Sequence, residues 1–268
     1  MSFFKNHWLL SITFIVIVIL PLFLFFYNRF YYARAVALLE TGNYAEAFVI
    51  FNELDSYRDS AQYAKFIKKN HNSDLIKLIS EGSIVSFGEY EQEGIEWIVL
   101  RKEINRILLI SRYTLDTIDP TFDNNYGIWN ESMLRWWLNN EFINKAFSAS
   151  ERSRILERYV DMDKNPEDDY APKPANGTHD KIFVLSISEA TSYFMFDADR
   201  VCKPTFYAED KGCFVDSNTG NGRWYLRTRG YGKHELATVN PDGSINYGGY
   251  QIPRSIGIRP ALWLEISK

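Results

Sequence analysis

The chain has 268 residues and a formal net charge of -4 at pH 7, with an isoelectric point near 5.7. This length allows one large or two modest domains with a buried core. A chain of this charge has no general attraction to nucleic acid phosphates, so we expect no nucleic acid partner. Aromatic residues make up 16% of the chain, a content that suits broad cores and binding surfaces alike.

The first extended apolar stretch lies near the N-terminus. No Asp, Glu, Lys or Arg stands between Lys5 and Arg29, and residues 8–27 are long enough to span a hydrocarbon layer of roughly 30 Å. Trp8 and Tyr27 stand at the ends of this run, where amphipathic rings favour the headgroup region. We therefore predict a single-pass transmembrane helix, with the lipid bilayer as its partner through residues 8–27. A cleaved signal peptide or a buried helix is the alternative.

The two sides of this stretch carry nearly equal positive charge, so the positive-inside rule does not decide its orientation. An N-terminal anchor followed by one large domain more often leaves that domain outside. We therefore predict a cell-membrane protein whose folded part is extracytoplasmic. Cys202 and Cys213 could pair as a disulfide there or remain free thiols, because two cysteines do not fix the redox compartment.

Residues 29–79 show helical periodicity and are expected to form a short all-α spacer. Within them, Gly42, Tyr44, Ala47 and Phe51 stand at the spacing of the second helix of a tetratricopeptide repeat, which this segment resembles. The resemblance covers about one repeat. Because one repeat cannot bury its own apolar face, it favours a helical spacer packed against the next domain over a peptide-binding superhelix.

After residue 80 the apolar period changes, and three strands are predicted over 84–87, 95–100 and 107–110. An amphipathic helix is then predicted over 129–147, which contains three of the seven tryptophans. Asn130 is its expected N-cap, and Asn139-Asn140 is expected to end its first part.

The rest of the chain alternates between short helices, loops and strands. Two capping boxes, Ser148 with Glu151 and Ser186 with Glu189, each predict a helix start. The predicted elements are a helix over 149–160, a loop over 161–180, a buried strand over 181–185, a helix over 186–196 and strands over 224–228, 236–239, 245–252 and 257–266. Helices between β-rich ends, without regular βαβ alternation, predict the α+β class. The predicted parts are a transmembrane anchor (1–28), the helical spacer (29–79) and an α+β domain (80–268).

The order of motifs in the last part resembles a known family. The series comprises Glu-Trp-x-Val-Leu at 96–100, Leu-Leu-Ile-Ser at 108–111, Trp-x-x-Ser-x-Leu-Arg-x-Trp-Leu-Asn at 129–139, Ala-Phe at 146–147, Asp-Lys-Ile-Phe at 180–183, Trp-Tyr-Leu-Arg at 224–227 and Arg-Pro-Ala-Leu at 259–262. Together it resembles an uncharacterised bacterial domain-of-unknown-function family, over roughly residues 82–266. The end of the series is distantly similar to the C-type-lectin-like fold shared with formylglycine-generating-enzyme-type domains. That resemblance implies a C-type-lectin-like mixed α+β domain, and the family brings no established activity with it.

The usual signatures of catalysis and cofactor binding are missing from the sequence. The four histidines are scattered without metal-ligand spacing, and no phosphate-binding, dinucleotide-binding or nucleophile-elbow motif occurs. We therefore expect no metal and no cofactor. The eleven-residue separation of Cys202 and Cys213 does not match the closely spaced reactive pair of formylglycine-generating enzymes.

Trp129, Trp224, Arg227 and Arg259 are the candidate ligand-binding residues. Each arginine lies in an apolar or aromatic run, where its usual role is to be buried and paired inside the core. The functional alternative is that these four side chains line one concave surface that holds a ligand.

On this basis we predict a membrane-anchored binding or sensing module with a C-type-lectin-like domain, whose ligand is a glycan, a peptide or a protein. Two alternatives stay open. The chain could be a modifying enzyme similar to formylglycine-generating enzymes, or an assembly partner of another membrane protein.

Overall fold

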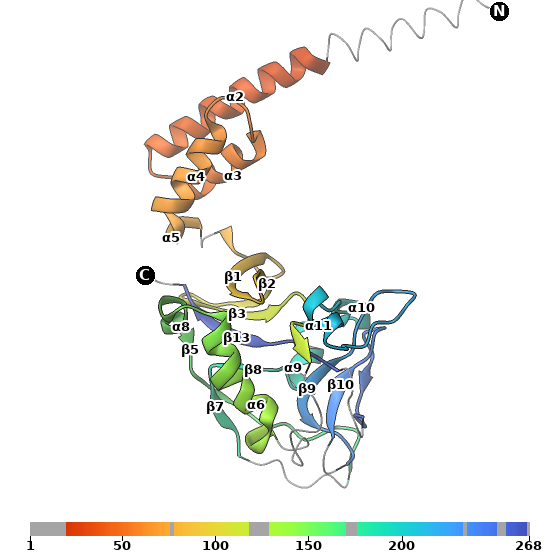
Figure 1. The fold of residues 1–268 in the computed structure, drawn as a ribbon. Helices are drawn as coiled ribbons and strands as arrows, with labels where there is room; N and C mark the ends of the chain where they lie inside the picture. Colours follow the sequence, from red (N-terminus) through yellow and green to blue (C-terminus); the bar gives the residue numbers. More distant parts are fainter. Residues whose placement is uncertain are drawn as a thin grey trace, which may run out of the picture. The chain divides into compact units, whose positions relative to one another are not determined.

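The computed structural model describes residues 20–75, 78–117, 129–169, 176–232, 235–250 and 256–266. The chain forms two compact units that divide between Ile79 and Ser80 (Figure 1).

The N-terminal unit consists of α2 (Leu20–Glu40), α3 (Tyr44–Leu54), α4 (Ser60–Asn70) and the short α5 (Asn72–Leu75). Its core is small, and its fully buried members include Ala35, Ala47, Phe51 and Ile67. The small side chains of Ala35 and Ala47 let the helices approach closely. Phe51 stacks on Tyr63 with ring centroids 4.9 Å apart. In this unit α3 packs on α2 and forms a helical hairpin with α4.

The prediction of a transmembrane anchor and of a single-pass membrane localisation is wrong by this structure. Among residues 20–75 and the other described ranges, no helix is long and apolar enough to cross a membrane. The reason is that α2 does not end at Tyr27 but continues to Glu40, so its described length also carries Asn28, Arg29 and Arg34. The remainder of the predicted span, residues 8–19, lies outside the described residues.

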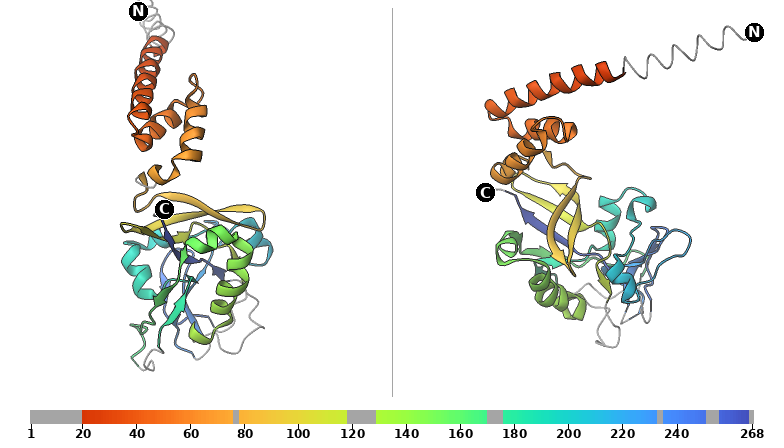
Figure 2. Two further views of the ribbon diagram at one scale, coloured as in Figure 1. Left: turned by 90° about the vertical axis from the view of Figure 1, so that its left-hand side faces the viewer. Right: turned by 45° about the horizontal axis from the view of Figure 1, so that its top comes forward.

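The C-terminal unit contains two larger sheets and one small one (Figures 1 and 2). In the first, β13 (Ala261–Glu265) pairs with β3 (Arg106–Ser111), with β5 (Ile155–Leu156) and with β8 (Ile182–Phe183). The order is β1-β2-β3-β13-β5, where β1 spans Ile84–Tyr90 and β2 spans Glu93–Lys102. All pairs in this sheet are antiparallel.

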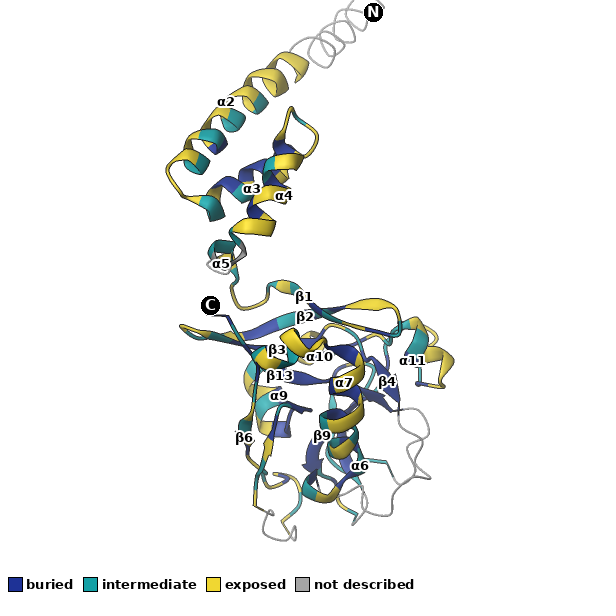
Figure 3. Ribbon diagram, turned by 60° about the vertical axis from the view of Figure 1, so that its left-hand side comes forward, coloured by how far each residue is buried: buried dark blue, intermediate teal, exposed yellow. Residues whose placement is uncertain are grey.

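The second sheet has the order β11-β10-β9-β12-β4. Its strands are β11 (Ile245–Asn246), β10 (Leu236–Val239), β9 (Trp224–Arg229), β12 (Gly257–Ile258) and β4 (Asp116–Thr117). The pair β12–β9 is parallel and the others are antiparallel. The small sheet joins β6 (Arg158–Val160) to β7 (Thr178–Asp180). β9, β10, β12 and the middle of β3 are almost entirely buried, as Figure 3 shows for β9, so the core of this unit lies along these strands.

Short helices connect and cover the sheets. They are the turn η4 (Trp129–Glu131), α6 (Met133–Trp137), the π-helical turn η5 (Leu138–Phe142), α7 (Ile143–Ala146), α8 (Ala149–Arg154), α9 (Ile187–Tyr193), α10 (Asp197–Arg200) and α11 (Phe206–Asp210). We call the continuous run of α6, η5 and α7, residues 133–146, the tryptophan helix. The unit therefore mixes helices and strands.

Several local predictions are confirmed and others are wrong. The three strands at 84–110 and the two capping boxes are present. The N-cap of the tryptophan helix is Ser132, not Asn130, because the Ser132 side chain accepts a hydrogen bond from the backbone of Arg135. The helix also does not stop at the paired asparagines, since the π turn carries it on to Ala146. The helix predicted over 149–160 ends at Arg154, where the chain joins β13 instead.

The tryptophan helix is fastened to β7 and β8 by its polar residues. Asp180, whose side chain is fully buried, accepts hydrogen bonds from Trp129 Nε1 at 3.1 Å and from Arg135 Nε at 2.7 Å. Asn139 donates to the Ile182 carbonyl at 2.8 Å and accepts from the backbone N–H groups of residues 181 and 182 at 3.0 and 3.1 Å. The polar residues of the tryptophan-rich motif therefore have a structural role, because each satisfies buried groups.

Candidate functional site

The four residues proposed from the sequence are all buried. Trp224 and Arg259 meet, with the Arg259 guanidinium carbon 4.9 Å from the Trp224 ring centroid. Arg259 donates to the Ser111 carbonyl at 3.0 Å, and Trp224 and Arg259 both donate to the Arg200 carbonyl, at 3.0 and 3.3 Å. Burial lowers the pKa of Arg259 from its ordinary value. The backbone carbonyls that surround the guanidinium compensate for its lost hydration.

Arg227 and Trp129 lie in separate networks. Arg227 donates to the carbonyls of Asp161 and Val184, both at 2.9 Å, and forms an ion pair with Glu189. Trp129 is bound to β7, as described above. At most 2% of any of these four residues is exposed. They therefore do not line one open surface, and a ligand-binding role for them has no support from their placement.

The two cysteines are free and buried, so the predicted alternative of a disulfide is not what the structure contains. Burial raises the pKa of Cys202, and it raises the pKa of Cys213 to about 11. The thiolate is the reactive form of cysteine, and these environments disfavour it. The placement of the thiols gives no support to a copper-dependent enzyme of the formylglycine-generating type.

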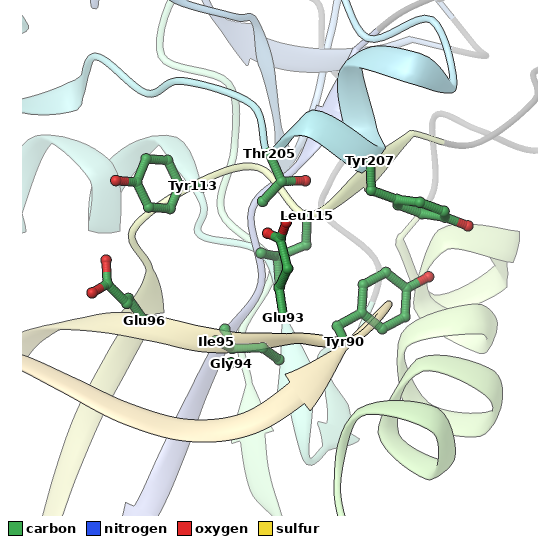
Figure 4. A pocket seen from close by; sticks show the side chains of 9 residues that line it. All are labelled: Tyr90, Glu93, Gly94, Ile95, Glu96, Tyr113, Leu115, Thr205 and Tyr207. Carbon is green, nitrogen blue, oxygen red and sulfur yellow. The ribbon is translucent and has the colours of Figure 1, made fainter.

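An open groove lies between the tip of the β1–β2 hairpin and residues 203–220 (Figure 4). It has an inner compartment of about 220 Å³ and an outer compartment of about 460 Å³, which share Glu93, Tyr113 and Thr205. The inner lining adds Tyr90, Gly94, Ile95, Glu96, Leu115 and Tyr207. The outer lining adds Lys203, Pro204, Phe206, Glu209, Val215 and Gly220. We call the two compartments together the tyrosine groove.

Main-chain contacts hold the far wall of the tyrosine groove. Thr114 and Pro204 form an isolated parallel bridge. The backbone of Thr205 donates to the Thr114 carbonyl at 3.0 Å, and the backbone of Thr114 donates to the Lys203 carbonyl at 3.1 Å. The Thr205 hydroxyl then caps α11 by accepting from the backbone of Ala208 at 3.2 Å. Segments about 90 residues apart in sequence are thereby fixed side by side.

The right-hand end of the inner compartment in Figure 4 is held by a polar network around the buried carboxylate of Asp116. The Tyr90 hydroxyl donates to Asp116 Oδ2 at 2.5 Å, and Lys211 Nζ lies 2.8 Å from Asp116 Oδ1. Burial and the hydrogen bond to Asp116 raise the pKa of Tyr90 well above its ordinary value, so this hydroxyl stays protonated. Tyr207 packs edge-on against Tyr90 at 5.8 Å. The two tyrosines are therefore rigidly placed before any ligand arrives.

The charged side chains of the groove differ in their partners. Arg112 pairs with Glu96 at 2.9 Å. In the part of the chain that the structure describes, the side chains of Glu93 and Glu209 make no hydrogen bond or ion pair. Glu93 points into the space between the hairpin and Thr205 (Figure 4). The groove thus presents aromatic rings together with carboxylates that are not neutralised.

Sequence reasoning missed the residues of this groove. The hairpin tip carries no turn dipeptide in the sequence, yet in the structure Tyr90 pairs with Glu93 across a two-residue turn. Its central residues, Glu91 and Gln92, have φ values of 50° and 68°, although such turns favour Asn and Gly. Glutamate and glutamine adopt this left-handed conformation less readily than glycine or asparagine, and backbone strain of this kind gathers at functional sites. The ion pair between Lys145 and Glu91 helps to hold the turn.

No group of three or more His, Cys, Asp or Glu side chains suited to a metal ion occurs in the described ranges. The described lining of the tyrosine groove also contains no histidine and no cysteine. The lining offers aromatic rings, carboxylates and one lysine.

The C-terminal unit is thus a mixed α+β domain with a preformed polar groove, and the comparisons with known proteins give its family. Residues 97–266 match the family described as a domain of unknown function, DUF6273. That match spans more than half of the chain, so the chain belongs to the DUF6273 family. No curated protein and no solved structure matches the chain. The predicted resemblance to an uncharacterised domain family is confirmed, whereas likeness to C-type lectins, formylglycine-generating enzymes or tetratricopeptide repeats is not shown.

Proposed function

We propose that the DUF6273 domain of this chain is a binding module and that the tyrosine groove is its ligand site. The observation that carries this proposal is the unneutralised carboxylate of Glu93, which points into a preformed hollow walled by Tyr113 and Tyr207. Aromatic rings supply large contact areas at low entropic cost, and polar groups among them fix a ligand's orientation. A glycan or a peptide segment fits such a surface.

Phe206 extends the surface at the mouth of the outer compartment. Its side chain lines that compartment while the residue is 84% exposed. Exposed aromatic residues next to a hollow are typical of binding surfaces, because they gain most from being covered. No acid, base and nucleophile lie bonded to one another in the described lining, and this lack favours binding over catalysis.

The test is to titrate the full chain with soluble cell-wall glycan fragments and with short peptides, and to measure binding by isothermal titration calorimetry. We expect one of these ligand classes to bind. Tyr113→Ala and Phe206→Ala should each weaken that binding about tenfold, the effect expected of aromatic contacts at a binding site. Phe196→Ala is the matched control, because Phe196 is 64% exposed and does not line the groove.

Equal binding by the wild-type chain and by both groove variants would show that the ligand binds elsewhere. Measurable turnover of a ligand would argue for an enzyme instead. Capture of a protein partner that is insensitive to the groove variants would favour the assembly alternative.

A further inference from the structure

The two compartments of the tyrosine groove differ in charge. The described lining of the inner compartment contains Glu93 and Glu96 and no basic side chain. The outer compartment contains Glu93, Glu209 and Lys203. The charged groups in the described lining that a ligand meets in the inner compartment are therefore both carboxylates, and they stand among tyrosine rings and the side chains of Ile95, Leu115 and Thr205.

The basic side chains nearest this compartment are already paired with other acids. Arg112 binds Glu96, while Lys211 binds the buried Asp116. Lys145, which lies over the Tyr90 ring, pairs with Glu91. Among these described carboxylates, Glu93 has no basic partner, and it lines both compartments where they meet.

We propose that the inner compartment binds the cationic head of a basic side chain, so that the ligand of the groove is a peptide segment containing arginine or lysine. This inference rests on the proposed function and narrows it to one ligand class. A guanidinium or ammonium group there would pair with Glu93, and this ion pair is the contact that attracts it. The rings of Tyr113 and Tyr207 would flank the group, although Arg112 and Lys211 already lie 5.4 and 5.3 Å from their centroids. Among the residues described in its lining, this compartment has no basic side chain that could pair with an acidic group.

Size supports one side chain in the inner compartment and the flanking backbone in the outer one. The inner volume of about 220 Å³ is below the range of roughly 300–1,000 Å³ typical of complete small-molecule sites, whereas the outer volume of about 460 Å³ lies within it. Because the compartments share three residues, an extended peptide can occupy both at once. Phe206 and Lys203 would then contact the residues beside the basic one.

The experiment uses the full chain and two capped glycine pentapeptides, one with a central arginine and one with citrulline, which has nearly the same shape without the charge. Saturation-transfer NMR and calorimetry at low ionic strength measure binding. We expect the arginine peptide to bind about fivefold or more tightly than the citrulline peptide, with an affinity that falls as salt is added. Glu93→Gln should remove most of that difference.

Glu89→Gln is the matched control, because Glu89 is an exposed carboxylate on the same hairpin and does not line the groove. Equal loss of affinity in the two variants would overturn the inference, since a general charge effect would then explain it. Equal affinity for the two peptides would overturn it as well. If a neutral chitin-type oligosaccharide binds instead and Tyr113→Ala weakens it, the basic-peptide inference fails while the proposed function stands. If a ligand binds and neither Tyr113→Ala nor Phe206→Ala weakens its binding, the basic-peptide inference and the proposed function both fail.

Discussion

Asn139 joins the tryptophan helix to the first sheet, and the Asn139→Ala substitution should destabilise the C-terminal unit strongly. The side chain makes three hydrogen bonds to the backbone of residues 181–182, at 2.8, 3.0 and 3.1 Å. A net hydrogen bond contributes about 1 kcal/mol, so we expect a loss of about 3 kcal/mol in the free energy of unfolding. In a unit of this size, that loss lowers the melting temperature by roughly 6–12 °C.

Thermal and urea unfolding followed by tryptophan fluorescence measure this loss selectively. Every tryptophan except Trp8 lies in residues 80–267, so the signal reports on the C-terminal unit. Asn140→Ala is the matched control, because the Asn140 side chain is exposed and bonds only to the Trp136 carbonyl, within its own helix. We expect that control to change the free energy of unfolding by less than about 0.5 kcal/mol.

Equal stability losses in the two asparagine variants would refute this reasoning. They would mean that the attachment of the tryptophan helix to β8 depends on apolar packing alone. The hydrogen bonds of Asn139 in the folded state would then be no more favourable than those that the same groups make to water in the unfolded state.

Three further predictions concern strain, pH and thiol reactivity. Gly243→Ala should destabilise the fold by more than Gly82→Ala: both glycines have φ near +85°, but a Cβ at Gly243 would lie 1.7 Å from a backbone oxygen, while the space at Gly82 is open. Urea midpoints measure the difference, and similar values would contradict it. Because the pKa of Tyr90 is raised in the folded state, its contribution to stability is complete below its ordinary value of 10.0 and is lost as pH rises further. Tyr90→Phe should therefore flatten the alkaline loss of stability in unfolding curves above pH 10.0 and leave its slope unchanged below that pH. Cys202 and Cys213 should resist alkylation in the native chain at pH 8 and react on unfolding, as mass spectrometry would show; rapid native labelling would be the contrary result.

Much of the fold follows from local patterns in the sequence. Short apolar runs predicted β1, β2 and β3, and the two capping boxes located the starts of α8 and α9. The π turn at Leu138–Phe142 could not be predicted in this way, because it depends on the hydrogen bonds between Asn139 and the backbone of β8 rather than on local propensity. The end of α8 at Arg154 likewise depends on pairing with β13, more than 100 residues further along the chain.

The candidate site was predictable to a smaller extent. Arg227 and Arg259 stood out because a charge in an apolar run needs a partner, and the structure supplies that partner inside the core. The residues of the tyrosine groove carry no local motif. Tyr113 and Thr205 come together only because Thr114 bridges to Pro204, a contact that no periodicity reveals.

The central position of β13 has a consequence for how this chain is made. β3 leaves the ribosome some 150 residues before Ala261, the first residue of the strand that covers its open edge. Until then, the apolar residues of β3 present unpaired backbone groups, the kind of edge that recruits other chains. Nascent chains of this family should therefore depend on chaperones, and a premature stop codon before residue 261 should yield inclusion bodies rather than a shortened, folded domain.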